Sequence, residues 1–209
     1  MRTPIRVAVL VSGGGTNLQA LIDAERAGKI KSGKLSLVIS NKEGAYALTR
    51  AENAGIPTET VLKKALGSAD AFEEKLLSLL SEYRIDVIVL AGFMSILSEN
   101  FTSRYEKRIL NVHPSLIPSF CGAGFYGLHV HEAVLKYGVK VTGATVHFVN
   151  EIPDGGEIIL QKAVTIRPCD TPETLQKRVM RLAEWKILPA ATEQVCASII
   201  ASKEGNTDL

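Results

Sequence analysis

Apolar runs alternate with helical patterns along the first half of the chain. The runs 7–11 and 87–90 contain no polar residue, as expected for strands that are buried on both faces of a parallel sheet. After the first run, Leu18, Leu21 and Ile22 recur at helical spacing. Repeated strand–helix units predict a doubly wound, Rossmann-like α/β sheet that is mostly parallel and has helices on both faces.

The second half of the chain departs from this repeat. Residues 139–149 alternate between two sets of side chains, which is typical of a strand with two different faces. Another strand is expected over 157–167, and a helix after Thr171, where an N-cap residue precedes a proline. We therefore expect a late antiparallel strand, followed by a last helix and a frayed tail over 202–209.

Composition and charge narrow the class of protein. A chain of 209 residues is typical of one domain that buries roughly 70% of its unfolded surface. Its 24 basic and 22 acidic residues are spread evenly, so no basic block indicates nucleic-acid binding. The apolar run 7–11 is too short for a secretory signal, and no stretch approaches the ~20 residues that cross a bilayer. We expect a cytoplasmic protein that binds neither nucleic acid nor membrane.

Cysteine and histidine spacing argues against disulfides and metal. The three cysteines, Cys121, Cys169 and Cys196, are odd in number and far apart, so they form neither a disulfide framework nor a paired metal motif. His129 and His131 stand two residues apart at the start of a predicted helix. Because residues two apart do not share a helix face, we expect no metal site there.

A glycine turn follows the first predicted strand. Ser12-Gly13-Gly14-Gly15-Thr16-Asn17 leads into a helix, and bare backbone amides at a helix start can bind a phosphate closely. Leu18 stands where a dinucleotide fingerprint has its third glycine, and the Gly-Lys-Ser/Thr of a P-loop is absent. A mononucleotide or sugar phosphate fits this turn better, and a simple tight connection is the alternative. If phosphate binds here, Gly15→Val should obstruct it.

Asn111 and His113 are the strongest candidates for chemistry. They are two residues apart at the end of an apolar segment, so they point to the same side of a strand. Pro114 and Pro118 then force the chain into a loop, at the edge where open α/β sheets bind ligands. A core histidine with a turn asparagine is the alternative. Further on, Asp154-Gly155-Gly156 has the composition of a turn.

The segment Asn111-Val112-His113-Pro114-Ser115-Leu116-Ile117-Pro118, taken with Asp154-Gly155-Gly156, resembles the folate-dependent formyltransferases. The resemblance covers nearly the whole chain and implies a single domain over 1–209, with a phosphate-binding half (1–100) and a catalytic and folate-binding half (101–201). It implies formyl transfer from 10-formyltetrahydrofolate to the amine of glycinamide ribonucleotide in de novo purine biosynthesis. The folate would be a co-substrate, with no permanently bound cofactor and no metal.

The resemblance also implies roles for individual residues. Formyl transfer to an amine passes through a tetrahedral oxyanion, for which Asn111 would supply a hydrogen-bond donor and His113 a proton donor. Asp154 would keep the imidazole charged and help to move the proton that the amine loses. His147 and Ser115 are expected to support these groups from behind.

The substrate-binding residues are likewise implied by the resemblance. The acceptor's phosphate and ribose would be bound by Gly13, Gly14, Gly15, Thr16, Asn17 and Glu184. The folate ring would be bound by Phe93, Met94, Ser95, Ile96 and Leu97. Ser95 stands where the familiar enzymes have arginine, so the folate contacts at this wall should differ. The loop 119–127, with three glycines and three aromatics, is expected to be a mobile cover.

Three alternatives remain open. Methionyl-tRNA formyltransferases share the Asn-x-His-Pro-Ser-Leu core but continue into a basic C-terminal domain. Formyltetrahydrofolate deformylases normally begin with a regulatory domain. A non-catalytic nucleotide-binding module would explain the glycine turn but leave Asn111, His113 and Asp154 as a coincidence. We expect a monomer or a homodimer.

Overall fold

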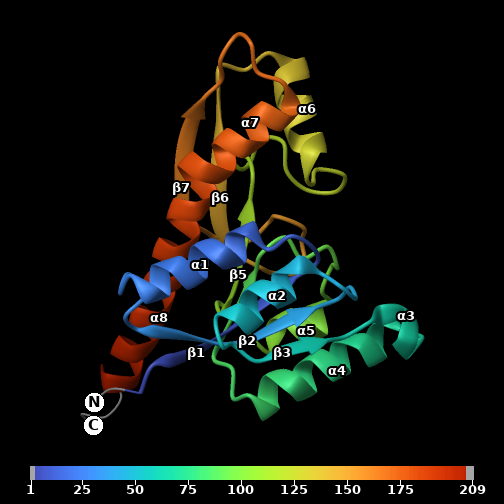
Figure 1. The fold of residues 1–209 in the computed structure, drawn as a ribbon, viewed down its shortest axis with the longest axis vertical. Helices are drawn as coiled ribbons and strands as arrows, with labels where there is room; N and C mark the ends of the chain where they lie inside the picture. The colour runs from blue at the N-terminus through green and yellow to red at the C-terminus, as the bar shows by residue number, and fades with distance from the viewer. Residues whose placement is uncertain (1–2, 206–209) are drawn as a thin grey trace.

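Seven strands form one sheet in the order β3-β2-β1-β4-β5-β6-β7 in the computed structural model, which describes residues 3–205 (Figure 1). The strands are β1 (Ile5–Val11), β2 (Gly33–Ser40), β3 (Thr58–Thr60), β4 (Val87–Leu90), β5 (Ile109–His113), β6 (Val141–Phe148) and β7 (Ile158–Thr165). Strands β1 to β5 pair in parallel, whereas β6 is antiparallel to both of its neighbours. The predicted doubly wound sheet with a late antiparallel strand is confirmed.

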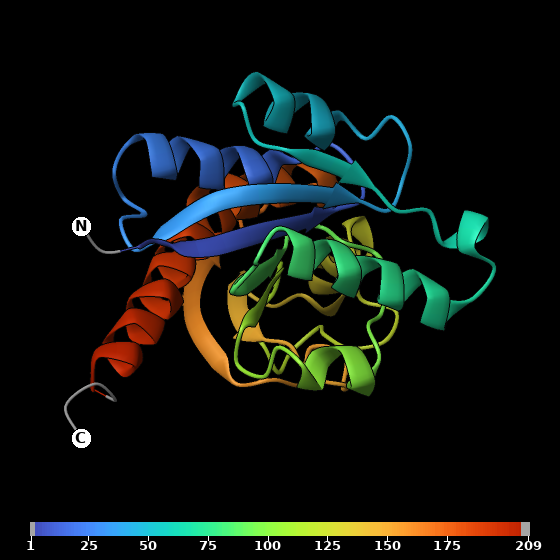
Figure 2. The ribbon, with the colours of Figure 1, turned by 90° about the horizontal axis from the view of Figure 1, so that it is seen from below.

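Helices cover both faces of the sheet. They are α1 (Thr16–Arg26), α2 (Tyr46–Asn53), α3 (Lys63–Leu66), α4 (Ala69–Glu82), α5 (Glu99–Ser103), α6 (Leu128–Tyr137), α7 (Pro172–Val179), the π-helix η1 (Met180–Glu184) and α8 (Trp185–Gly205). Figure 2 shows α1 and α2 on one side of β1 and β2, with α4 and α5 on the other. Helices α6, α7 and α8 pack with α1 and α2 in one core, and α4 and α5 pack in a second.

The two cores explain the uninterrupted apolar runs. Successive strand residues point to opposite faces, and Val7 and Val9 of β1 belong to one core while Ala8 and Leu10 belong to the other. All four side chains are fully buried. A polar side chain at any of these positions would therefore lose its hydrogen bonds to water without gaining a hydrogen-bond partner in the protein.

The predicted tail over 202–209 is wrong in its first residues, because α8 continues to Gly205. Ile199 and Ile200 pack against the core in the preceding turn, and Lys203 Nζ lies 3.4 Å from Asp86 Oδ1. These contacts hold the last turn of the helix. Residues 206–209 lie outside the described part of the chain.

The strand order predicts where in the sheet a ligand should bind. From β1 the chain proceeds to β2 on one side, and later returns to β4 on the other side. The carboxyl ends of β1 and β4 therefore part at a switch point, where open α/β sheets bind ligands. In the described range 3–205, no helix is long and apolar enough to cross a membrane.

Candidate active site

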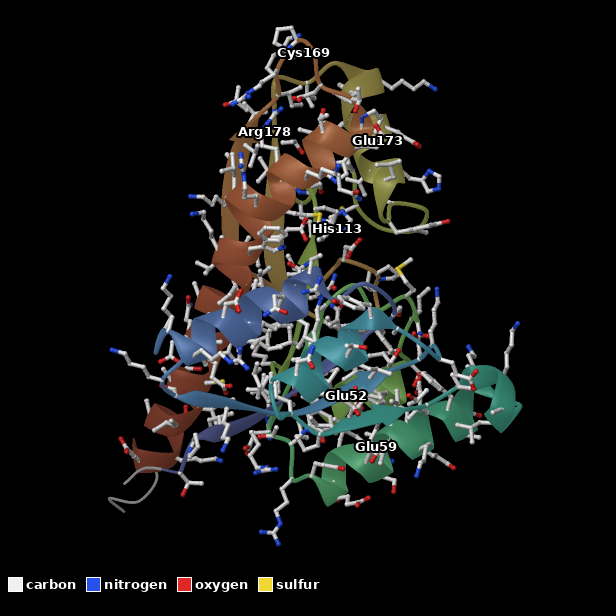
Figure 3. All side chains as sticks on the ribbon, in the orientation of Figure 1. Glu52, Glu59, His113, Cys169, Glu173 and Arg178 are labelled. Atoms are coloured by element: carbon white, nitrogen blue, oxygen red, sulfur yellow. The ribbon has the colours of Figure 1, made fainter. Side chains whose placement is uncertain are left out.

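A cavity of about 700 Å³ opens at the carboxyl ends of β4 and β5. The predicted site residues that line it are Asn17, Phe93, Met94, Ser95, Ile96, Asn111, His113, Asp154 and Glu184. They come from five separate parts of the chain, and the fold brings them together. Figure 3 shows His113 near the middle of the molecule, below α6 and α7.

Asp154 lies at the centre of the polar groups in this cavity. Its Oδ2 accepts a hydrogen bond from the Gly122 amide at 2.8 Å and lies 3.4 Å from His113 Nδ1. Its Oδ1 is 3.4 Å from Asn111 Nδ2 and 3.5 Å from His147 Nε2. One carboxylate thus connects the amide and both imidazoles, although 41 positions separate it from His113.

Backbone carbonyls determine which nitrogen of each ring carries hydrogen. A carbonyl oxygen only accepts, so His147 Nδ1 donates to the Phe148 carbonyl at 2.8 Å. Its Nε2 lies 3.2 Å from Asn111 Nδ2 and 3.5 Å from Asp154 Oδ1, so this nitrogen can accept from Asn111 or, when it carries a proton, donate to Asp154. By the same argument, His113 Nε2 donates to the Phe120 carbonyl at 2.8 Å, and its Nδ1 faces Asp154.

Burial and charge have opposite effects on His113. Burial lowers the pKa of this imidazole, while the Phe120 carbonyl and the Asp154 charge raise it, and burial is the larger effect. The net pKa of His113 in the free protein is therefore lowered. For Asp154, burial raises the pKa, but hydrogen bonds from His147 and Gly122 together with the His113 charge hold it below its usual value. Asp154 is therefore the charged member of the pair.

The Asp-Gly-Gly sequence has a steric reason. Asp154 has a φ of 56°, in the left-handed region that Asp and Asn tolerate better than most residues. A side chain at Gly156 would lie 1.8 Å from the Phe148 carbonyl oxygen, and one at Gly155 would lie 2.6 Å from Ile152. Gly156 lets the β6–β7 connection pass close to the end of β6, and Gly155 lets the connection fold back on Ile152. This path carries Asp154 back to the end of β5.

The glycine turn is packed on one side and open on the other. A Cβ at Gly15 would lie 2.6 Å from Ala47 of α2, and Gly15 has a φ of 70°. By contrast, a Cβ at Gly13 or Gly14 would meet nothing within 4 Å. The expectation that Gly15→Val would test phosphate binding is therefore wrong, since that substitution would first disrupt the packing of the turn on α2.

Asn17 and Glu184 join the glycine turn to the last helical segment. Asn17 Nδ2 donates to Glu184 Oε2 at 2.8 Å, and both side chains are buried. Burial raises the pKa of Glu184 to about 7, which the hydrogen bond from Asn17 opposes. Glu184 is the last residue of the π-helix η1, a distortion that often occurs at functional sites.

The remaining predicted residues lie outside the cavity lining. Leu97 is buried in the core under α4 and α5. Ser115 Oγ donates to the Ser119 carbonyl at 2.6 Å, so it shapes the loop that follows. His147 lies behind Asn111 and Asp154 and touches both. Thr16 lines a different groove.

Sequence reasoning missed several residues of the cavity. Its lining includes residues 122–127 of the predicted cover loop, and also His131 and Gln176. The spacing of His129 and His131 in the sequence bears only on metal binding, and no periodic pattern separates Gln176 from a solvent-facing residue. In the described range, no group of three or more His, Cys, Asp or Glu side chains could hold a metal ion.

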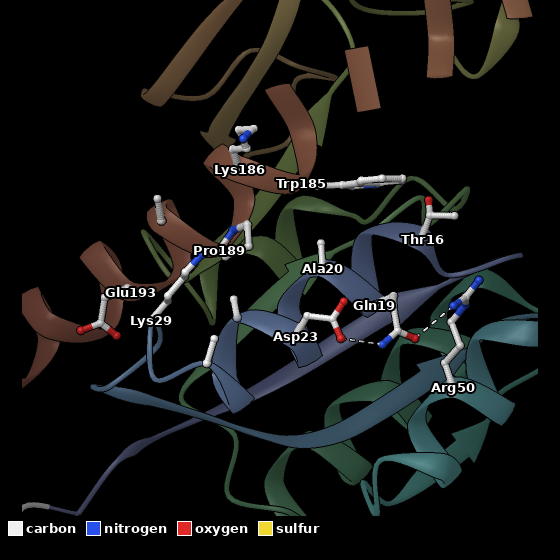
Figure 4. Close-up of a pocket in the computed structure, with 13 residues that line it drawn as sticks. Thr16, Gln19, Ala20, Asp23, Lys29, Arg50, Trp185, Lys186, Pro189 and Glu193 are labelled. Carbon is white, nitrogen blue, oxygen red and sulfur yellow. Dashed lines mark hydrogen bonds between the residues drawn. The ribbon is translucent and has the colours of Figure 1, made fainter. Parts of the chain in front are cut away.

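A larger groove of about 930 Å³ runs between α1 and α8 (Figure 4). It contains none of the proposed catalytic residues. Its lining includes Thr16 and Trp185, the sequence neighbours of Asn17 and Glu184. This groove is larger than the cavity at β4 and β5. The smaller cavity is nevertheless the better candidate for an active site, because titratable side chains converge on it.

Comparison with known proteins identifies the family. The sequence pattern described as "Formyl transferase" matches residues 5–192. Phosphoribosylglycinamide formyltransferase of Escherichia coli (strain K12) is 44% identical over 175 residues, which are 84% of this chain and 80% of that protein. The trifunctional purine biosynthetic protein adenosine-3 of Homo sapiens is 47% identical over 195 residues, 93% of this chain. The present chain spans 19% of that protein's length.

Solved structures agree with this result. Glycinamide ribonucleotide transformylase 1 from Symbiobacterium toebii has a TM-score of 0.87 and 40% identity, covering 93% of this chain and 89% of that one. Phosphoribosylglycinamide formyltransferase from Brucella melitensis has a TM-score of 0.85 and 42% identity, covering 93% and 97%. With its seven-stranded sheet and a sequence match over 5–192, the chain belongs to the formyl transferase family.

Proposed function

We propose that this protein transfers a formyl group from 10-formyltetrahydrofolate to the amine of glycinamide ribonucleotide, a step of purine biosynthesis. The names of its relatives support this acceptor. The observation that carries the proposal is that Asn111, His113 and Asp154 converge on one cavity, although they are distant in sequence. Ser12 and Asn41 tie the neighbouring loops to this edge through Met94 N and Ser95 Oγ.

The reaction needs no covalent enzyme intermediate. The acceptor amine attacks the formyl carbon and forms a new C–N bond, while the formyl oxygen takes up the negative charge. Collapse of this tetrahedral intermediate breaks the bond to the folate nitrogen, which receives a proton as the acceptor amine loses one. The protein must therefore stabilise an oxyanion and move a proton.

Asn111 and His113 suit these two tasks. The carboxamide of Asn111 donates hydrogen bonds at every pH, so it can stabilise the oxyanion throughout the reaction. The Nε2–H of His113 points to the Phe120 carbonyl in the free protein. A shift of the loop 119–127 would release this N–H for the oxyanion, and Asp154 would stabilise the imidazolium as a proton passes through the ring.

The cavity walls differ in polarity, which supports a division between the two substrates. Phe93, Met94 and Ile96 present apolar surface suited to the flat folate ring. Asn17 and Glu184 present polar groups beside the glycine turn, which suits a ribose and its phosphate. Gly13 and Gly14 leave room for that phosphate because no neighbouring atom fills the space of a Cβ.

The test is consumption of 10-formyltetrahydrofolate by the purified protein, followed spectroscopically with and without glycinamide ribonucleotide. We expect consumption only when the acceptor is present, with stoichiometric formation of its formylated product. Folate hydrolysis without an acceptor would indicate a deformylase, and formylation of charged initiator tRNA would indicate the tRNA-specific branch. Either result, or no turnover at all, would refute the proposed acceptor. Light scattering of the same preparation would test the expected monomer or homodimer.

A further inference from the structure

His131 has unused hydrogen-bonding capacity inside the cavity. It lies in the first half of α6 with 0% of its surface exposed, and it lines the cavity. Within the described range 3–205, neither Nδ1 nor Nε2 has a hydrogen-bond partner. The other three histidines each have one: His113 with Phe120, His147 with Phe148, and His129 with Glu132.

An unpaired buried imidazole is unfavourable for folding. Leaving a buried polar group without a partner costs about 1–3 kcal/mol, and an apolar side chain at this position would avoid that cost. The neighbouring buried residues of α6, Val130 and Val134, are apolar and belong to the core. His131 therefore has the properties expected of a residue that finds its partner in a ligand.

His131 lies on the polar wall of the cavity. Helix α6 packs against α7, and the helical segment α7–η1 supplies Gln176 and Glu184 to the same lining. His131 is also close enough to His113 for the two rings to interact electrostatically. His131 thus interacts with the proposed reacting group at His113 and lines the same cavity as Glu184, the proposed ribose-binding residue.

The chemistry of the proposed acceptor matches this position. In glycinamide ribonucleotide a carboxamide separates the reacting amine from the ribose. A neutral imidazole has one N–H donor and one lone-pair acceptor, and it can pair with either the oxygen or the N–H of that carboxamide. Burial lowers the pKa of His131 to about 4, with a smaller contribution from the His113 charge, so the ring is neutral at pH 7.

We propose that His131 is an acceptor-binding residue whose imidazole hydrogen-bonds the carboxamide of glycinamide ribonucleotide. This inference rests on the proposed function and assigns a residue to the part of the acceptor between its amine and its ribose. A loss of this bond would leave the carboxamide unpaired in the cavity, and it should weaken acceptor binding about tenfold or more. The folate donor should be unaffected.

The experiment compares His131→Phe, His131→Gln and the control His129→Gln with the wild-type protein. For His131→Phe we expect an unchanged or higher Tm, because the unpaired ring is replaced by an apolar one, together with a raised KM for the acceptor. The KM for 10-formyltetrahydrofolate should not change. His131→Gln should restore part of the acceptor affinity, since its amide can also donate and accept. His129→Gln changes an exposed histidine of the same helix and should behave as wild type.

The outcomes separate the inference from the proposed function. A lower Tm of His131→Phe with an unchanged KM for the acceptor would show a purely structural histidine and overturn the inference. Equal changes in both KM values, in His131→Phe and in His131→Gln, would also overturn it. If the wild-type protein does not formylate glycinamide ribonucleotide at all, the proposed function fails and the inference fails with it. If the wild type is active and only the inference is wrong, the His131 variants alone reveal it.

Discussion

Asp154→Asn is the substitution that tests the site most directly. It removes one negative charge and keeps the size and shape of the side chain. Asparagine tolerates the left-handed backbone at this position, where φ is 56°, and its amide oxygen can still accept the hydrogen bond from Gly122. The fold should therefore be retained, and both substrates should still bind.

The expected loss of rate follows from the geometry. Asp154 Oδ2 lies 3.4 Å from His113 Nδ1. Two unit charges at this separation attract each other by about 5 kcal/mol when the effective dielectric constant is about 20. This value sets the order of magnitude of the stabilisation of an imidazolium in the transition state. Since each ~1.4 kcal/mol is a factor of ten, kcat should fall by roughly 10²–10⁴, which is the usual contribution of one acid–base partner.

The pH profile provides a second readout. Burial lowers the pKa of His113, and the Asp154 charge is one of the two effects that raise it. Removing this charge should therefore move the apparent histidine pKa in the kcat profile to lower pH. The assay is steady-state formyl transfer over the pH range in which the protein is folded, with substrate affinities measured separately by calorimetry.

A matched control is Asp170→Asn, which removes a carboxylate paired with Arg178 outside the cavity. It should lower Tm and leave the pH profile unchanged. Near-normal kcat in Asp154→Asn, with the wild-type pH profile, would show that Asp154 belongs only to a turn. The double variant Asn111→Ala/Asp154→Asn should lose less than the sum of the two single effects, because both groups serve one transition state. Full additivity would contradict a shared role.

Three further predictions follow from the same geometry. Gly14→Ala should raise the KM for the acceptor at unchanged Tm, whereas Gly15→Ala should destabilise the fold by about 2–4 kcal/mol through left-handed strain and overpacking; equal effects on Tm would contradict this distinction. Because burial raises the pKa of Glu184 from 4.5 to about 7, the free energy of unfolding should fall as the pH rises through this interval. In Glu184→Gln the free energy of unfolding should depend less on pH over this interval. If urea titrations at several pH values show the same pH dependence in the variant and the wild type, the prediction is contradicted. Either substrate should slow proteolytic cleavage within 119–127, and cleavage at the same rate with and without both substrates would argue against a mobile cover.

The sequence alone determined the class of fold, because burial restricts which residue types a strand can contain. Strands that are covered on both faces admit few polar residues, so the runs 7–11 and 87–90 predict a parallel sheet without any knowledge of their partners. The alternation over 139–149 likewise predicts a strand, which the structure shows as β6, although it is buried on both faces. Asn111 and His113 lie in one strand, so their common direction follows from the two-residue period of β structure.

Only the tertiary structure decided which distant groups meet. Asp154 reaches His113 because the β6–β7 connection passes close to β6 at Gly156, and no local pattern contains that approach. The same holds for Gly15, whose neighbour Ala47 comes from another helix. The isolation of His131 can be seen only when all surrounding elements are in place. Periodicity records whether a residue is buried, whereas hydrogen bonds and pKa shifts depend on which atoms lie within a few ångströms, and that depends on how the whole chain packs.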